Sequence, residues 1–195
     1  MTVMNKRVIL SLLLGCCWVP LQAQQFALKS NALYWSWGTA NLGAELALSR
    51  RSTFSVTGNY NLRPSDRDYC IQAWFVQPEY RYWLTGKYTR AYVGANLLAG
   101  QYDIRGIRLP WIYKRMINSR YTGWAIAAGG SFGYAFYLSP HWNIEVMAGV
   151  GAAYVKYRGE PLHGATESSS WRRRRILPVL TEVGVSAVYL FNSRK

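Results

Sequence analysis

The sequence predicts an all-β protein: an eight-stranded antiparallel up-and-down transmembrane β-barrel. Apolar and polar residues alternate with a period of two, which puts them on opposite faces of a strand. Charged residues make up only 16% of the 195-residue chain and aromatic residues 15%, whereas a soluble domain usually carries about 25% charged residues. The links between the predicted strands alternate between short and long, as in outer-membrane barrels, and only the short first link departs from that order.

The stretch 74–83 is the clearest strand, the fourth of the eight. Its even positions are apolar or aromatic, and its polar phase carries Gln77, Glu79 and Arg81. A helix would bring polar and apolar side chains to the same side. Pro78 cannot donate to a neighbouring strand, and a closed barrel has no free edge. We therefore expect a bulge there, a local widening, or one unpaired carbonyl on the neighbouring strand.

Three strands precede this stretch, each with an apolar phase and a polar or small phase. They are expected at 26–35, 41–48 and 53–62. The break at 36–40 and the tight turn at 49–52 separate them, and the polar loop 63–70 leads into the fourth strand.

Four longer strands follow it. They are expected at 91–104, 123–138, 142–157 and 176–191. Two turns, at 85–90 and 139–141, are short, while two long basic segments, 105–122 and 158–175, follow the fifth and the seventh strand. The last strand alternates aromatic residues up to Phe191, which resembles the terminal strand that outer-membrane insertion machinery recognises, although four residues trail behind it.

The polar phase of these strands gathers charged and small side chains. Its polar members are Lys29, Asn31, Glu45, Glu79, Arg81, Glu145 and Glu182. Its glycines include Gly129, Gly133, Gly149, Gly151 and Gly184. The lumen of an eight-stranded barrel is barely wide enough for side chains, so small residues must offset large ones, and buried charges need partners. We therefore predict a narrow lumen closed by a polar network of salt bridges.

The apolar phase carries aromatic residues near both ends of several strands, with aliphatic or small residues between them. The aromatic pairs are Phe26 and Tyr34, Phe54 and Tyr60, Trp74 and Tyr82, Trp124 and Phe136, and Trp142 and Tyr154. Aromatic girdles around an apolar band are typical of a barrel in a bilayer. We expect this face to meet lipid.

The N-terminus predicts export. Lys6 and Arg7 precede an apolar run of 11 residues, 8–18, which is shorter than the roughly 20 residues of a membrane-spanning helix. We expect residues 1–23 to be a signal peptide and residues 24–195 to form one barrel domain in the bacterial outer membrane. Lipoprotein processing at an upstream cysteine, Cys16, is the alternative.

The net charge and the number of cysteines limit the classes of partner and the disulfides that this chain can have. The net charge is +14, but an exported protein would rarely meet nucleic acid, so anionic lipid head groups or polysaccharide are the natural partners. Beyond the signal only Cys70 remains, so no intramolecular disulfide can form. An intermolecular bridge or a nucleophile is the alternative to an unreactive thiol.

Six motifs run through the chain after the signal. They are Lys29-Ser30-Asn31-Ala32-Leu33-Tyr34, Asn41-Leu42-Gly43-Ala44-Glu45, Gly58-Asn59-Tyr60-Asn61, Val76-Gln77-Pro78-Glu79, Gly100-Gln101-Tyr102 and Gly149-Val150-Gly151. In these motifs the chain resembles an uncharacterised family of small outer-membrane barrels from Bacteroidota, which are OmpA/OmpX-like eight-stranded barrels. The resemblance implies no catalytic residue. Genes of this kind are often found near fimbrial assembly genes, so it implies a role in fimbrial or envelope assembly.

Catalysis finds little support in the sequence. A lipid-modifying hydrolase needs a base within hydrogen-bond reach of a nucleophile, but His141 lies in a short turn and His163 in a long loop, and neither lies on a strand beside a serine. No cluster of His, Cys or carboxylate residues has metal-ligand spacing, and Gly149-x-Gly151 is not a nucleotide-binding loop. We predict no enzymatic activity, no cofactor and no metal.

Four consecutive arginines follow Trp171, namely Arg172, Arg173, Arg174 and Arg175. They form a candidate anion-binding loop for lipopolysaccharide phosphate or an acidic partner. A solvated loop that repels self-association is the alternative.

These observations predict a monomeric, non-enzymatic integral outer-membrane barrel. It would contact outer-membrane lipid and lipopolysaccharide, and its basic loops 105–122 and 158–175 would serve a structural or surface-interaction role toward an envelope or fimbrial protein. The alternatives are a soluble calycin-like barrel that binds an apolar ligand with its faces exchanged, and an outer-membrane lipid-modifying enzyme. The sequence identifies no ligand.

Overall fold

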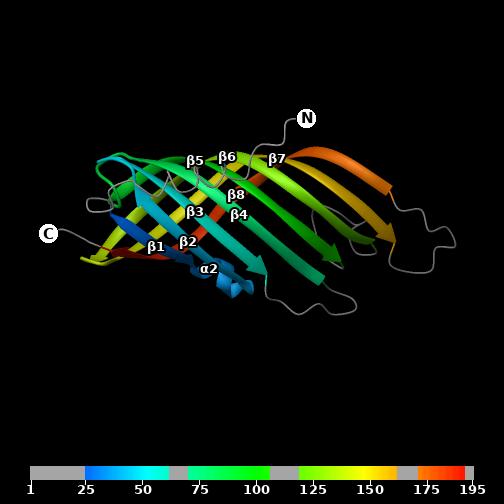
Figure 1. Cartoon of the computed structure of the whole chain (residues 1–195), viewed down its shortest axis with the longest axis horizontal. Helices are drawn as coiled ribbons and strands as arrows, with labels where there is room; N and C mark the ends of the chain where they lie inside the picture. The colour runs from blue at the N-terminus through cyan, green and yellow to red at the C-terminus, as the bar shows by residue number, and fades with distance from the viewer. Residues whose placement is uncertain (1–24, 62–69, 106–118, 162–170, 192–195) are drawn as a thin grey trace, which may run out of the picture.

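Eight antiparallel strands close into a barrel in chain order (Figure 1). The structure is a computed structural model, and it describes residues 25–61, 70–105, 119–161 and 171–191. In chain order the elements are β1 (Phe26–Asn31), α2 (Ala32–Ser36), β2 (Thr39–Ala47), β3 (Ser52–Asn61), β4 (Cys70–Trp83), β5 (Arg90–Arg105), β6 (Ser119–Ser139), β7 (Trp142–Pro161) and β8 (Trp171–Phe191). The prediction of an all-β, eight-stranded, up-and-down barrel is confirmed. The expected signal segment 1–23 lies outside the described residues.

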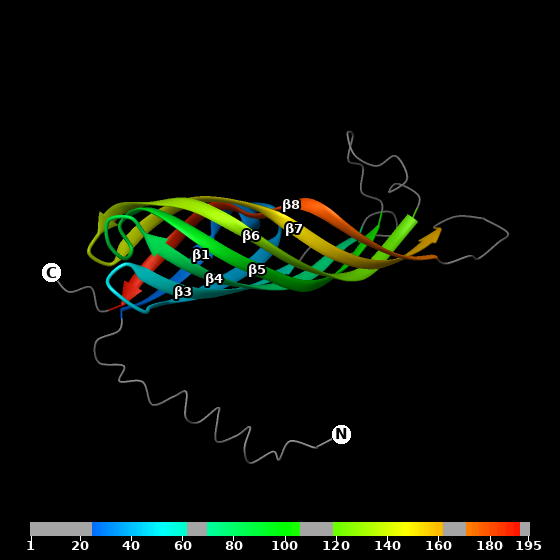
Figure 2. The ribbon, with the colours of Figure 1, turned by 90° about the horizontal axis from the view of Figure 1, so that it is seen from above.

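The two ends of the barrel differ. Short connections join β2 to β3, β4 to β5 and β6 to β7 at one end, which we call the turn end; the opposite end is the loop end. β1 has 6 residues, whereas β6, β7 and β8 have 21, 20 and 21. The long strands therefore project past β1 to β3 at the loop end as a curved sheet (Figures 1 and 2).

β6, β7 and β8 extend further toward the loop end than predicted, so the two long basic connections between strands are shorter than predicted. β6 begins at Ser119 and β7 continues to Pro161, so only 106–118 and 162–170 of those segments lie outside the described residues. The prediction that Arg172 to Arg175 form a loop is wrong, because these residues pair with Val155 to Arg158 of β7. A run of like charges is typical of a loop, but the ladder with β7 supplies the backbone hydrogen bonds that keep the run extended.

The first strand is shorter than predicted. It ends at Asn31, whose side chain accepts a hydrogen bond of 3.0 Å from the Leu33 amide and caps the short helix α2. Asparagine competes with a strand ladder in this way because its side chain can replace a backbone partner. The prediction that Tyr34 is an outward aromatic residue of the first strand is therefore wrong. Its ring lies 6.1 Å from that of Phe75. Gly38, with a φ of 72°, then allows the chain to enter β2.

Helix α2 lies in the barrel wall where β1 ends. β1 pairs with β8 only from Ser186 to Phe191. Among the described residues, the part of β8 before Ser186 has β7 as its only strand neighbour, and the Asn31 side chain donates a 3.1 Å hydrogen bond to the Val183 carbonyl there. Pro178 lies in this part of β8, and proline is found on such edges because it lacks an N–H.

Three irregularities interrupt the described ladders, and one of them is a register shift between Tyr137 and Ser139, beside the short turn from β6 to β7. The register between β4 and β5 is the same on both sides of Pro78, so no bulge forms, but the pairs that Gln77 and Pro78 would make with β5 are missing. A bulge occurs instead between β7 and β8, where Gly149 and Val150 oppose Glu182 and Leu180. The residue between them, Thr181, is therefore buried together with Glu182.

Candidate functional site

The barrel is polar inside and apolar outside. The structure places all seven polar residues of the predicted network in its interior, each at most 8% exposed; they are Lys29, Asn31, Glu45, Glu79, Arg81, Glu145 and Glu182. Large apolar side chains cover the outer face instead, among them Leu97 and Phe132, which are 54% and 56% exposed. A water-soluble barrel has the opposite arrangement.

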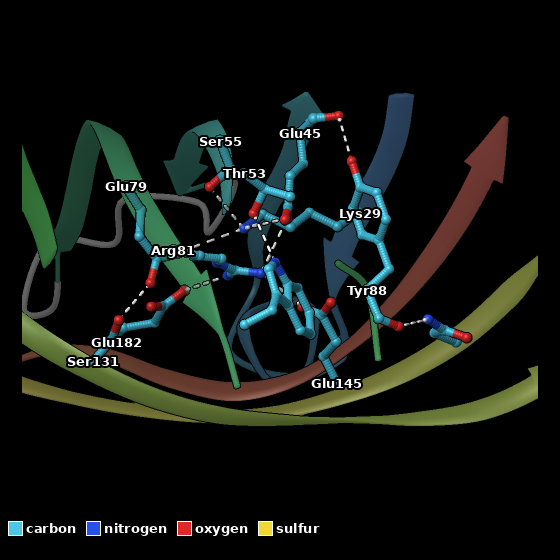
Figure 3. Close-up of polar contacts among 12 residues, drawn as sticks. Lys29, Glu45, Thr53, Ser55, Glu79, Arg81, Tyr88, Ser131, Glu145 and Glu182 are labelled. Carbon is cyan, nitrogen blue, oxygen red and sulfur yellow. Dashed lines mark hydrogen bonds and ion pairs between the residues drawn. The ribbon is translucent and has the colours of Figure 1, made fainter. Parts of the chain in front are cut away.

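Arg81 lies at the centre of the buried network (Figure 3). Its Nε donates to Glu79 Oε2 at 2.6 Å, and its Nη1 lies 3.0 Å from Glu45 Oε2 and 2.9 Å from Glu145 Oε2. Its Nη2 lies 3.7 Å from Glu182 Oε1. The four carboxylates come from β2, β4, β7 and β8, so one guanidinium links opposite sides of the barrel.

Lys29 supplies the second positive charge of the network. Its Nζ lies 3.7 Å from Glu45 Oε2 and 3.7 Å from Glu79 Oε2, and it donates to Ser55 Oγ at 3.1 Å. Ser131 donates from the other side to Glu79 Oε1. The Glu79 carboxylate therefore has partners at both oxygens, as a buried charge requires.

Three aromatic residues close the barrel below this network, at the turn end. The Tyr92 ring lies 4.4 Å from the Arg81 guanidinium carbon and 4.8 Å from the Trp83 ring. Trp83 is fully buried and donates through Nε1 to Thr53 Oγ1 at 3.0 Å. The Tyr88 ring lies 5.9 Å from that of Trp83.

Tyr88 holds the turn between β4 and β5 inside the barrel. Its hydroxyl donates to the carbonyls of Gln25 and Glu45 at 3.2 and 3.4 Å, and its own carbonyl accepts from the Asn143 side chain at 2.8 Å. Burial raises the pKa of Tyr88, and the Glu45 and Glu145 carboxylates raise it further. The phenol therefore stays neutral and remains a donor. Its φ of 61°, rare for a bulky residue, is maintained by these contacts.

The loop end of the lumen is also narrow. A cavity of about 20 Å³ lies between Lys29, Asn31, Tyr34, Gln77 and Glu182, which is room for about one water molecule. Glycines elsewhere allow the tight packing: a Cβ on Gly94 would lie 2.7 Å from Glu79 Oε1, and one on Gly133 would overlap the Tyr92 ring. At the level of Arg81 the described side chains fill the lumen, since Arg81, Glu45 and Glu145 are all fully buried.

Several members of this interior were absent from the predicted network. Trp83 and Tyr92 share the inward phase with Arg81 and Asn96, so their positions were available from the period-two pattern. Tyr88 lies in a turn, where no periodicity applies. Ser131 could be placed inside the barrel from its phase, but its contact with Glu79 depends on the register of β4, β5 and β6.

The metal-ligating residue types do not form a metal-binding cluster in the described part of the chain. No group of three or more His, Cys, Asp or Glu residues among them could hold a metal ion. The exposed His141 ring lies 6.0 Å from that of Tyr189, while His163 lies outside the described residues. In the described part of the chain, no helix has the length and apolar character needed to cross a membrane.

The family comparison covers nearly the whole chain. Residues 8–191 match the profile of a family described as a protein of unknown function, DUF3575. No curated protein and no solved structure matches the chain. The protein thus belongs to the DUF3575 family, with a barrel fold whose interior is a closed charged network.

Proposed function

We propose that this protein is a non-enzymatic integral barrel of the bacterial outer membrane with a closed lumen. It would act as a structural or surface-interaction protein through its loop end, in the manner of the small Bacteroidota outer-membrane barrels that its sequence resembles. The observation that carries the proposal is the reversed distribution of side chains: charges are buried in the barrel while large apolar side chains cover its outside. An apolar solvent makes such an outer face favourable, which supports a position in a bilayer.

The outer face has the layers that a bilayer requires. At the turn end, outward aromatic rings pack on one another, with 5.5 Å between the rings of Phe26 and Phe191 and 5.1 Å between those of Trp142 and Tyr189. At the loop end, the rings of Trp124 and Tyr154 lie 5.7 Å apart. Exposed aliphatic residues lie between these levels, namely Val76, Leu97, Ile126, Val146 and Val150. Two aromatic girdles around an aliphatic band support a membrane position.

Strand length supports the same position. A tilted strand needs about 9–11 residues to cross the hydrocarbon region. β2 and β3, with 9 and 10 residues, have that length, whereas β6 to β8 are about twice as long. The surplus of β6 to β8 would stand outside the bilayer and present a surface to an envelope or fimbrial partner.

The charged interior argues against the soluble alternative. A calycin-like barrel that binds an apolar ligand needs an apolar cavity, but the interior described here holds six charged side chains and closes around them. The same closure favours an anchoring or surface role over transport.

Membrane integration can be tested with the purified protein lacking residues 1–23. We expect it to require detergent or lipid to remain folded, and to migrate faster on a gel before boiling than after boiling. Fractionation of producing cells should recover it with outer-membrane markers. A protein that stays folded and monomeric in buffer without detergent would overturn the proposal.

A further inference from the structure

Two cross-strand pairs of positive side chains lie on the outside of β7 and β8, and in each pair a residue of β7 is directly opposite a residue of β8. Lys156 pairs with Arg174, and Arg158 pairs with Arg172. We call these four residues the outer basic patch. Like charges at opposite positions of neighbouring strands destabilise a sheet, so this arrangement calls for a compensating anion.

The alternation of the strands decides which arginines belong to the patch. On β8 the outward residues are Arg172, Arg174 and Ile176, whereas Arg173 and Arg175 oppose Tyr157 and Val155 on the other face of the sheet. The run of four arginines is thus two pairs with different surroundings, and only one pair faces the outside of the barrel.

Neighbouring arginines of this surface have acidic partners. Arg120 forms a bidentate pair with Asp103, in which its Nε lies 2.9 Å from Asp103 Oδ1. Arg158 pairs with Glu160 at 3.2 Å. Among the described residues, no carboxylate contacts Lys156, Arg172 or Arg174. Three of the four cations of the patch, Lys156, Arg172 and Arg174, therefore have no carboxylate partner among the described residues.

The patch lies directly beyond the aromatic and apolar surface. Trp124 opposes Lys156 on β6, and the next outward positions toward the turn end are Tyr154 and Ile176. Two residues of a strand span about 7 Å, so the cationic groups lie within reach of the level at which Trp124 and Tyr154 meet the bilayer surface. The apolar surface then continues along the same two strands through Leu180, which is 70% exposed.

We propose that the outer basic patch binds the phosphate groups of a phosphorylated glycolipid in the leaflet at the loop end. Lys156, Arg172 and Arg174 would donate to the phosphates, because charge-assisted hydrogen bonds from guanidinium groups suit phosphate oxygens. The acyl chains would lie along Ile176, Leu180 and the neighbouring apolar residues of β7. This continuity of cations with an apolar surface selects a lipid rather than a soluble anion. The inference rests on the proposed membrane position.

Native mass spectrometry of the detergent-solubilised protein tests the proposal. The probes are bis-phosphorylated lipid A and the same lipid with both phosphates removed, at equal concentration. We expect the wild type to retain the phosphorylated lipid about tenfold better or more, since a few charge-assisted contacts provide at least that factor. Equal retention of the two lipids would overturn the proposal.

The two pairs within the arginine run supply a matched control. Arg172→Gln with Arg174→Gln should lose the preference for the phosphorylated lipid, whereas Arg173→Gln with Arg175→Gln should keep it, although both double variants remove the same charge from the same strand. Equal loss in both would mean a non-specific charge effect and would contradict the proposal. The single variant Lys156→Gln should weaken the preference several-fold, which keeps the test decisive if a double variant does not fold.

Two further readings separate the possible failures. A wild type that shows the heat-dependent gel shift but no preference for phosphate would contradict the patch alone, whereas absence of the gel shift would contradict the membrane position itself. Inorganic phosphate at the same concentration as the lipid should not displace the bound bis-phosphorylated lipid A. Displacement by inorganic phosphate would identify a site for free anions and would overturn the assignment to a lipid.

Discussion

Arg81 contacts four carboxylates within 3.7 Å, and it is fully buried. Replacing it by methionine would leave these carboxylates with Lys29 as the remaining cation of the network. Because an uncompensated buried charge is costly, Arg81→Met should lower the free energy of unfolding by about 3–5 kcal/mol. Urea titration of the protein in lipid vesicles, followed by tryptophan fluorescence, would measure this difference.

An exposed arginine provides the control for that experiment. Arg175→Met removes the same charge from a solvent-exposed position and should change the stability by less than about 0.5 kcal/mol. Equal unfolding midpoints for the two variants would show that the lumen network does not stabilise the barrel.

Glycine at position 133 is required by the ring of Tyr92. An added Cβ would overlap that ring, which is itself held between Arg81 and Trp83. Gly133→Ala should therefore destabilise the barrel by about 1–3 kcal/mol, the usual cost of overpacking. Gly58→Ala is the matched control, because nothing lies within 4 Å of the Cβ position on the outer face. The same urea titration would test the pair, and a similar cost at both positions would contradict a crowded lumen.

At the scale of elements, the period-two pattern predicted all eight strands and the inward phase of the network. It failed where a tertiary contact determined the end of a strand, and where both faces of a strand are exposed to solvent. Residues 26–35 alternate throughout, yet the Asn31 side chain ends the strand by capping α2 and by bonding to Val183, far away in the sequence. Arg172 to Arg175 show no alternation because both faces of the projecting part of β8 are exposed, so composition alone favoured a loop.

The bulge opposite Gly149 shows why the details of the site could not be predicted. It shifts the phase of β8 by one residue, so that Thr181 and Glu182 both point inward. The sequence around Glu182 has no signal for the extra residue. The contact between Glu182 and Arg81 also requires the closure of the whole barrel, which depends on the register of every pair of strands.

Strand β7 permits a test of the lipid-facing band. Val146 is 45% exposed on the outer face, and Tyr134 and Val185 oppose it on the neighbouring strands. If this face meets lipid near the middle of the bilayer, Val146→Arg should cost about 2–4 kcal/mol. Gln72→Arg, at an exposed outward position on β4 two residues beyond Trp74 and opposite Asp103, should cost less than about 0.5 kcal/mol. Folding into vesicles measured by urea titration would compare them, and equal costs would argue against a lipid boundary between the two positions.

At the scale of the whole molecule, the barrel separates two kinds of tryptophan. Trp142 is 47% exposed in the outward girdle of the turn end, whereas Trp83 is fully buried and bonded to Thr53 inside the lumen. Variants that keep only one of these two tryptophans, with phenylalanine at the other tryptophan positions, would report which face meets the acyl chains. In vesicles of brominated phosphatidylcholine, fluorescence from Trp142 should be strongly quenched, since bromine quenches on contact, while Trp83 should keep most of its intensity. A soluble barrel with exchanged faces would give the reverse order or no quenching at either position, and either result would refute the membrane assignment.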